Sequence, residues 1–258
     1  MYILVLFLPL LSSVVAGLFG RKVGEKGAGI FTSCCILLTC ITSYFILYEV
    51  GFNGCPTYLH LWTWMDLSTF TVSFGLMFDS LTAVMLIVVT TVSTLVHIYS
   101  TEYMNGDPHL PRFMSYLSLF TFFMLILVTA DNILQLFIGW EGVGLCSYLL
   151  INFWYTRLQA NKSAIKAMIV NRVGDAALAI GMFLLFYTFK SLDFNHIFAL
   201  VPYLLNDTIS IATYECNTIT CIGILLLVGA AGKSAQLGLH TWLPDAMEGK
   251  STQRVSFT

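Results

Sequence analysis

Four ionisable residues lie inside apolar stretches of this 258-residue chain: Glu141, Arg172, Asp175 and Lys233. A charge at the centre of a membrane costs about 2.5–3.5 kcal/mol on insertion scales, so such residues need partners and mark candidate functional sites. A carboxylate and an amine held away from water stabilise each other's charge, and changing their separation changes how tightly the amine holds its proton. The chemistry that these residues predict is proton transfer through a membrane.

Glu141 is the most deeply placed of the four. It follows the start of its predicted helix by about nine residues, or about 14 Å, which puts it near the middle of a membrane. It has no opposite charge within its own apolar stretch. Close approach of another helix, or entry of water, is favoured by the glycines around it, which are Gly139, Gly142 and Gly144.

Lys233 also lacks an opposite charge within its own apolar stretch. A helix that is weakened or broken at depth is predicted here, as where transporters line a polar cavity, by the flanking Gly229, Gly232, Gly238 and Pro244. We expect Lys233 and Glu141 to approach each other, directly or through water, in the inner half of the bundle.

Arg172 and Asp175 are three residues apart, so they share a face of one helix and can form an ion pair within it. Two interpretations follow. The pair either supports proton transfer or satisfies its own charges as a structural element. His97, near the inner end of its helix, is expected at the membrane interface rather than in a proton relay.

The elements that must position these residues are about seven transmembrane helices, each with roughly the 20 residues needed to cross about 30 Å. The fold class predicted is therefore an all-α, polytopic transmembrane bundle. The apolar segments run from Tyr2 to Gly20, Ile30 to Val50, Gly75 to Ser100, Phe113 to Ala130, Asn132 to Trp154, Ala164 to Phe189 and Asn217 to Leu239.

The positive charges orient this bundle. With the N-terminus outside, Lys190 is the one cation of the outer loops. The inner loops then carry Arg21, Lys22, Lys26, Arg112, Arg157, Lys162 and Lys166. Cytoplasmic or matrix loops are enriched in Lys and Arg, so this asymmetry places the N-terminus outside.

The composition excludes several classes of function. Hydrophobic residues make up 57% of the chain and charged residues 10%, against about 25% charged in soluble domains. A net charge of −2 argues against a nucleic-acid partner. The chain has no GxGxxG after a strand, no P-loop and no HExxH motif, and no Cys/His spacing suits zinc, haem or an iron–sulfur cluster. We therefore expect no cofactor, metal or redox centre in this chain.

Four motifs resemble one family, subunit 5 of respiratory complex I in its mitochondrial form, an antiporter-like membrane subunit. They run from Asp131 to Leu150, Lys166 to Asp175, Gly232 to Gln236 and His240 to Gly249. The resemblance implies proton translocation coupled to electron transport in NADH:ubiquinone oxidoreductase, whose NADH and ubiquinone belong to the whole complex. It implies the mitochondrial inner membrane, with the N-terminus on the intermembrane-space side, and the neighbouring antiporter-like subunit and the lipid bilayer as partners.

The same resemblance implies roles for the four residues. Family members have two inverted repeats of five helices, each with a proton half-channel. Glu141 matches the glutamate of the fifth helix, Lys233 the lysine of a broken seventh helix, and Asp175 the sixth-helix acid that tunes this pair, with Arg172 in support. Cation/proton antiporter subunits are related, and provide an alternative function.

The resemblance ends at Gly249, where family members continue into an eighth helix that carries a histidine. The expected organisation is three N-terminal transmembrane helices in 1–110, an incomplete first repeat of four helices in 111–249, and a divergent polar tail in 250–258. Two readings stay open at this point. The gene encodes a subunit of the proton-translocating enzyme, or this fragment is a truncated remnant that is inactive in isolation.

Overall fold

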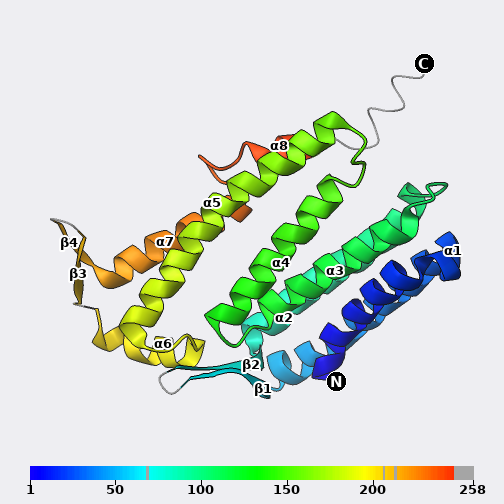
Figure 1. Cartoon of the computed structure of the whole chain (residues 1–258). Coiled ribbons are helices and arrows are strands. Elements are labelled where there is room, and N and C mark those ends of the chain that lie inside the picture. Colours follow the sequence, from blue (N-terminus) through cyan, green and yellow to red (C-terminus); the bar gives the residue numbers. More distant parts are fainter. Residues whose placement is uncertain (68–69, 206, 212–213, 247–258) are drawn as a thin grey trace. The chain divides into compact units, whose positions relative to one another are not determined.

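The computed structural model describes residues 1–67, 70–205, 207–211 and 214–246 (Figure 1). Residues 250–258, the predicted polar tail, lie outside this part of the chain. The elements are α1 (Tyr2–Ile46), η1 (Leu47–Phe52), β1 (Thr57–Leu67), β2 (Phe70–Phe78), α2 (Ser80–Tyr103), α3 (Leu110–Val128), α4 (Ile133–Ile151), α5 (Leu158–Phe189), α6 (Phe194–Leu200), η2 (Val201–Tyr203), β3 (Thr208–Ile211), β4 (Tyr214–Asn217), α7 (Thr218–Lys233) and α8 (Trp242–Ala246).

The prediction of a helical, multi-pass membrane fold is confirmed, and the described part of the chain is mostly helical. In the described part of the chain, five helical segments are long and apolar enough to cross a membrane. The first of them contains two predicted spans, because α1 breaks at Gly24, where φ is 77° and ψ is 172°. A positive φ favours glycine, since other residues meet a steric penalty there. With the shorter α7 of 16 residues, the count is consistent with about seven spans.

Two small β-sheets were not predicted. β1 pairs with β2, and β3 pairs with β4 in antiparallel register from Thr208 opposite Asn217 to Ile211 opposite Tyr214. β1 and β2 are rich in aromatic and β-branched residues, which favour strands. The third span was placed too early, because β2 holds the residues from Gly75 to Phe78.

The true start of α2 is coded locally by a capping box. The Asp79 carboxylate accepts a hydrogen bond from the backbone N–H of Thr82 at 3.1 Å, and the Thr82 hydroxyl accepts one from the Asp79 N–H at 2.8 Å. Reciprocal capping of this kind satisfies donors that the first helical turn leaves unpaired.

The chain divides into two compact units. The first comprises residues 1–64, 73–131 and 135–150, and the second comprises 65–72, 132–134 and 151–258. In the first unit, α1 packs against α2 and α3. Small and hydroxyl-bearing residues fill this interface, as in other membrane helix pairs. Ser115, for example, donates a hydrogen bond to the Ser13 carbonyl at 2.8 Å, and Ser43 and Thr90 share one at 2.8 Å.

In the second unit, α5 packs against α7 and α8. α5 has 32 residues, or about 48 Å at 1.5 Å per residue, so it exceeds the thickness of the hydrocarbon core. Its C-cap is Lys190, which adopts a left-handed conformation with φ 57°. The N-cap of α7 is Asn217, whose side chain accepts hydrogen bonds from the N–H groups of Ile219 and Thr220 at 3.0 and 3.3 Å.

Candidate functional site

Glu141 lies on α4, in the first unit, and is half-buried. The face of α4 that packs on α3 is defined by two glycines: a side chain at Gly139 would meet the backbone of Leu127, and one at Gly142 would meet the ring of Phe123. At about 100° per residue, Glu141 lies about a third of a turn away from this face. Its carboxylate therefore projects from a different side of α4 than the one that holds α4 to α3.

Asp175 and Lys233 belong to the second unit, where two helices meet through glycine. A Cβ atom added to Gly174 would lie 3.2 Å from the Gly229 carbonyl oxygen and 3.2 Å from the Gly232 Cα. Such contacts allow the backbones to approach more closely than larger side chains would. Gly174 directly precedes Asp175, and Gly232 directly precedes Lys233. The crossing of α5 and α7 therefore brings the turn that carries Asp175 against the turn that carries Lys233.

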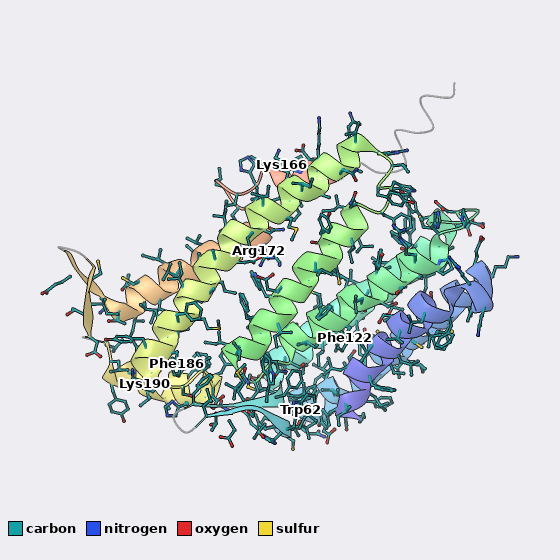
Figure 2. All side chains as sticks on the ribbon, viewed as in Figure 1. Trp62, Phe122, Lys166, Arg172, Phe186 and Lys190 are labelled. Carbon is teal, nitrogen blue, oxygen red and sulfur yellow. The ribbon has the colours of Figure 1, made fainter. Side chains whose placement is uncertain are left out.

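Burial separates the two charged residues of α5. Asp175 is 5% exposed, whereas Arg172, three residues earlier, is exposed (Figure 2). Their spacing puts them on the same side of the helix, about 4.5 Å apart along its axis. An acid in this position needs compensation, because burying a charge is costly unless it is paired. Both interpretations of Arg172, as a residue that supports proton transfer and as a structural partner, stay predictions.

Lys233 is the last residue of α7 and is half-buried. The helix ends there through hydrogen bonds from Gln236 N–H to the Ala231 carbonyl at 3.0 Å and from Ala235 N–H to the Gly232 carbonyl at 3.4 Å. Ala235 has φ 50°, so this end is a Schellman motif. A cation at a helix C-terminus is also stabilised by the helix dipole, which is the structural alternative to a transport role.

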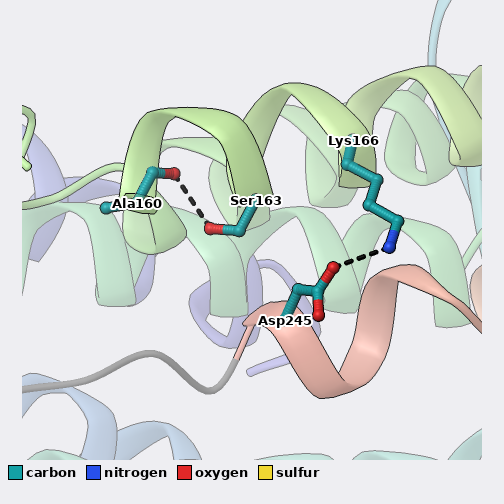
Figure 3. Close-up of polar contacts among 4 residues, drawn as sticks. All are labelled: Ala160, Ser163, Lys166 and Asp245. Atoms are coloured by element: carbon teal, nitrogen blue, oxygen red, sulfur yellow. Dashed lines mark hydrogen bonds and ion pairs between the residues drawn. The ribbon is translucent and has the colours of Figure 1, made fainter. Parts of the chain in front are cut away.

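The segment after this end of α7 is attached to the helices by two polar contacts. The indole N–H of Trp242 donates to the Gly232 carbonyl at 3.2 Å. Lys166 Nζ on α5 lies 2.6 Å from Asp245 Oδ2 on α8 (Figure 3). Lys166 is one of the predicted inner cations, and the sequence pattern indicates no partner for it. The signal in the sequence for this pair is that Lys166 and Asp245 each lie in one of the four motifs that resemble the family.

His97 is more deeply buried than the sequence indicated, with no exposed surface. Its Nδ1 lies 2.8 Å from the Ser93 carbonyl oxygen and its Nε2 lies 3.3 Å from the hydroxyl of Ser118 on α3. The neighbouring polar residues of α2, Thr90 and Thr94, are buried too. Their helical spacing with His97 was a signal for a polar helix interface, because positions three and four residues apart share one face.

Comparison with known proteins agrees with this architecture. Residues 130–257 match the family described as NADH:quinone oxidoreductase/Mrp antiporter, transmembrane. Residues 64–114 match the family described as NADH-ubiquinone oxidoreductase (complex I), chain 5 N-terminus. Among solved structures, the Mrp complex from a Dietzia species has a TM-score of 0.77 and is 26% identical, over 95% of this chain and 25% of that one.

Curated relatives are closer in sequence. The chain is 62% identical over 249 residues to NADH-ubiquinone oxidoreductase chain 5 of Metridium senile, covering 96% of this chain and 40% of the relative. It is 56% identical to the protein of that name from Chondrus crispus, covering 96% of this chain and 37% of the relative. The chain thus spans about two fifths of the length of these relatives. It belongs to the family of NADH-ubiquinone oxidoreductase chain 5.

Proposed function

We propose that this chain contributes to proton translocation driven by electron transfer from NADH to ubiquinone, as part of the membrane arm of complex I. The observation that carries the proposal is the glycine crossing of α5 and α7, which holds the turns of Asp175 and Lys233 together within apolar helices. An acid and an amine on facing turns of membrane helices form the arrangement expected of a proton-transfer site.

The proposed mechanism depends on charge separation. Opposite charges attract by about 4 kcal/mol at 4 Å and about 2 kcal/mol at 8 Å in an effective dielectric of about 20. Moving a carboxylate from about 4 Å to about 8 Å from the Lys233 amine would thus weaken the binding of a proton by that amine by about 2 kcal/mol, or about thirtyfold. That energy corresponds to moving one charge through a membrane potential of about 90 mV. Lys233 is the proton carrier in this scheme, Asp175 is the acid on the facing turn, and Glu141 is a further proton-transfer residue, on α4.

The wider setting is part of the same proposal. The location is the mitochondrial inner membrane, with the N-terminus on the intermembrane-space side, because the cations of the predicted inner loops outnumber those outside. The partners are other membrane-arm subunits, in particular the neighbouring antiporter-like subunit. NADH and ubiquinone are bound elsewhere in the complex, and this chain supplies no redox centre.

The test uses the whole complex that contains this chain, in sealed membrane vesicles. NADH-driven proton uptake is measured with a pH-sensitive dye beside the rate of NADH oxidation. Lys233→Gln and Glu141→Gln should lower both rates, and Glu141→Asp, which keeps the charge, should be milder. Lys162→Gln is the matched control, because it removes an exposed cation near the start of α5. Native gels confirm equal assembly. Full proton uptake by an assembled Glu141→Gln or Lys233→Gln complex would remove the proposed role.

A second candidate function is that of a cation/proton antiporter subunit, which is favoured by the likeness to the Mrp complex over 95% of this chain. The same vesicles distinguish the two. An imposed sodium gradient that drives proton movement without NADH, and that Lys233→Gln abolishes, supports the antiporter. Proton movement that requires NADH and is insensitive to sodium supports the complex I function.

A further inference from the structure

The first unit contains a cavity of about 1000 Å³ where two polar connections meet. One is the break in α1 at Gly24, and the other is the connection that leads into α3. Neither the proposed proton path nor the family resemblance assigns a role to this cavity. Its charged or ionisable lining residues are Arg21, Glu25, Lys26, His109, Arg112 and Tyr116.

The cavity lies at the end of membrane-spanning helices. The segment from Tyr2 to Val23 precedes the break in α1 and is about 33 Å long at 1.5 Å per residue, enough to cross the hydrocarbon core once. Arg112 is in the first turn of α3, which is about 28 Å long by the same measure. Both sides of the cavity therefore lie at the depth of the phospholipid headgroups.

Close packing below the cavity explains why it opens where it does. A Cβ atom on Gly17 would lie 2.9 Å from the Ser115 hydroxyl oxygen, and one on Gly20 would lie 2.7 Å from the Pro111 Cβ. α1 and α3 are thus in tight contact up to this level. At Gly24 the backbone leaves the helical path, and no atom lies within 4 Å of the position where its Cβ would be.

The charges around the cavity favour an anion. Three cations, Arg21, Lys26 and Arg112, face one carboxylate, that of Glu25, so the formal charge of the lining is +2 with His109 neutral. Guanidinium groups bind phosphate oxygens through paired, charge-assisted hydrogen bonds, and lysine adds a point charge. Basic pockets between membrane helices are suited to the phosphates of anionic lipids.

An adjoining groove distinguishes a lipid from a free phosphate. A second cavity of about 510 Å³ shares Glu25 and Lys26 with the first. Apolar side chains line it further along, including Ile30, Leu37 and Ile98. A molecule with a phosphate at one end and a hydrocarbon chain at the other can occupy both cavities. We propose that this site binds an anionic phospholipid, with its phosphate among Arg21, Lys26 and Arg112 and an acyl chain in the groove between α1 and α2.

The test is a titration of the purified full chain in neutral detergent, followed by native mass spectrometry. The probe is tetraoleoyl diphosphatidylglycerol, and dioleoyl phosphatidylcholine is the neutral comparison. One basic residue near a membrane surface contributes about fivefold to the affinity for anionic lipid. Replacing Arg21, Lys26 and Arg112 together with Gln should weaken binding by at least tenfold.

The matched control replaces three cations that do not line the cavity, Arg157, Lys162 and Lys190, with Gln; the affinity should change by less than threefold. Glu25→Gln removes the one carboxylate of the first cavity's lining, while Glu102 of the second cavity is kept, and should strengthen binding about fivefold. This variant keeps the proposal testable if the triple variant fails to fold, because its effect has the opposite sign.

The last measurement is the binding of inorganic phosphate to the same variants. Equal losses in the two triple variants would show that the lipid responds to net charge alone, and no gain in Glu25→Gln would show that Glu25 does not face the bound phosphate. Either result would overturn the site. Saturable binding of inorganic phosphate that is lost with the three cations, together with lipid binding that is not, would also overturn the lipid assignment. Preference for diphosphatidylglycerol over phosphatidylcholine that follows the cavity variants supports it.

Discussion

Gly139 is the position where one methyl group should have a large and calculable effect. A Cβ atom there would lie 2.7 Å from the backbone nitrogen of Leu127 and 2.8 Å from its Cα. Both are backbone atoms of α3, so no side-chain rotation relieves the contact. To restore ordinary van der Waals separation, α4 and α3 must move apart by about 0.7 Å around the substitution.

The cost of Gly139→Ala can be isolated with a matched substitution. Overpacking a well-packed interface costs about 1–3 kcal/mol, and a backbone contact belongs to the upper part of that range. Alanine in place of glycine also stabilises a helix by about 1 kcal/mol. Gly223→Ala on α7 shares this gain, but its Cβ would meet no atom within 4 Å. The difference between the two variants therefore reports the steric cost alone, about 2–3 kcal/mol.

The assay is thermal unfolding of the full chain in detergent, followed by circular dichroism at 222 nm. With about 2–4 °C lost per kcal/mol for a chain of this size, Gly139→Ala should unfold roughly 4–12 °C below Gly223→Ala. Equal midpoints for the two variants would refute the reasoning, since they would mean that α3 and α4 are not held together through this glycine.

Three further outcomes are expected. Ala235→Gly should raise the stability by about 0.5–1 kcal/mol in chemical unfolding, because φ 50° is strained for alanine and glycine relieves more than its entropy costs; a loss of stability would contradict this. Asp245→Asn should cost less than about 1 kcal/mol and lose its effect in high salt, because the pair with Lys166 is 43–46% exposed. Asp175→Asn should reduce NADH-driven proton uptake less than Glu141→Gln does, and an equal or larger loss would contradict this ranking.

Much of the architecture could be read from the chain because it is coded within single elements. Apolar length alone indicates a membrane-spanning segment, and a glycine in a polar run indicates the break in α1 at Gly24. The depth of Glu141, which follows from its distance along an apolar stretch, stays a prediction. Desolvation makes such residues conspicuous without knowledge of any contact.

Other features depend on contacts between distant parts of the chain. Asp245 meets Lys166 79 positions away, and no local pattern pairs one surface cation with one carboxylate. The strands β1 and β2 were missed because short apolar segments fit helices and strands alike until a pairing partner is known.

Two further features also depend on contacts between distant parts of the chain. They are the crossing of Gly174 with Gly232 and the basic cavity at the break in α1. Each residue was visible in the sequence, as a helix glycine or as a cation of a predicted inner loop. Which glycines touch, and which cations share one opening, depends on how the helices pack. Packing is decided by shape and close contact over the whole helix surface, and the order of residues in a single helix does not specify it.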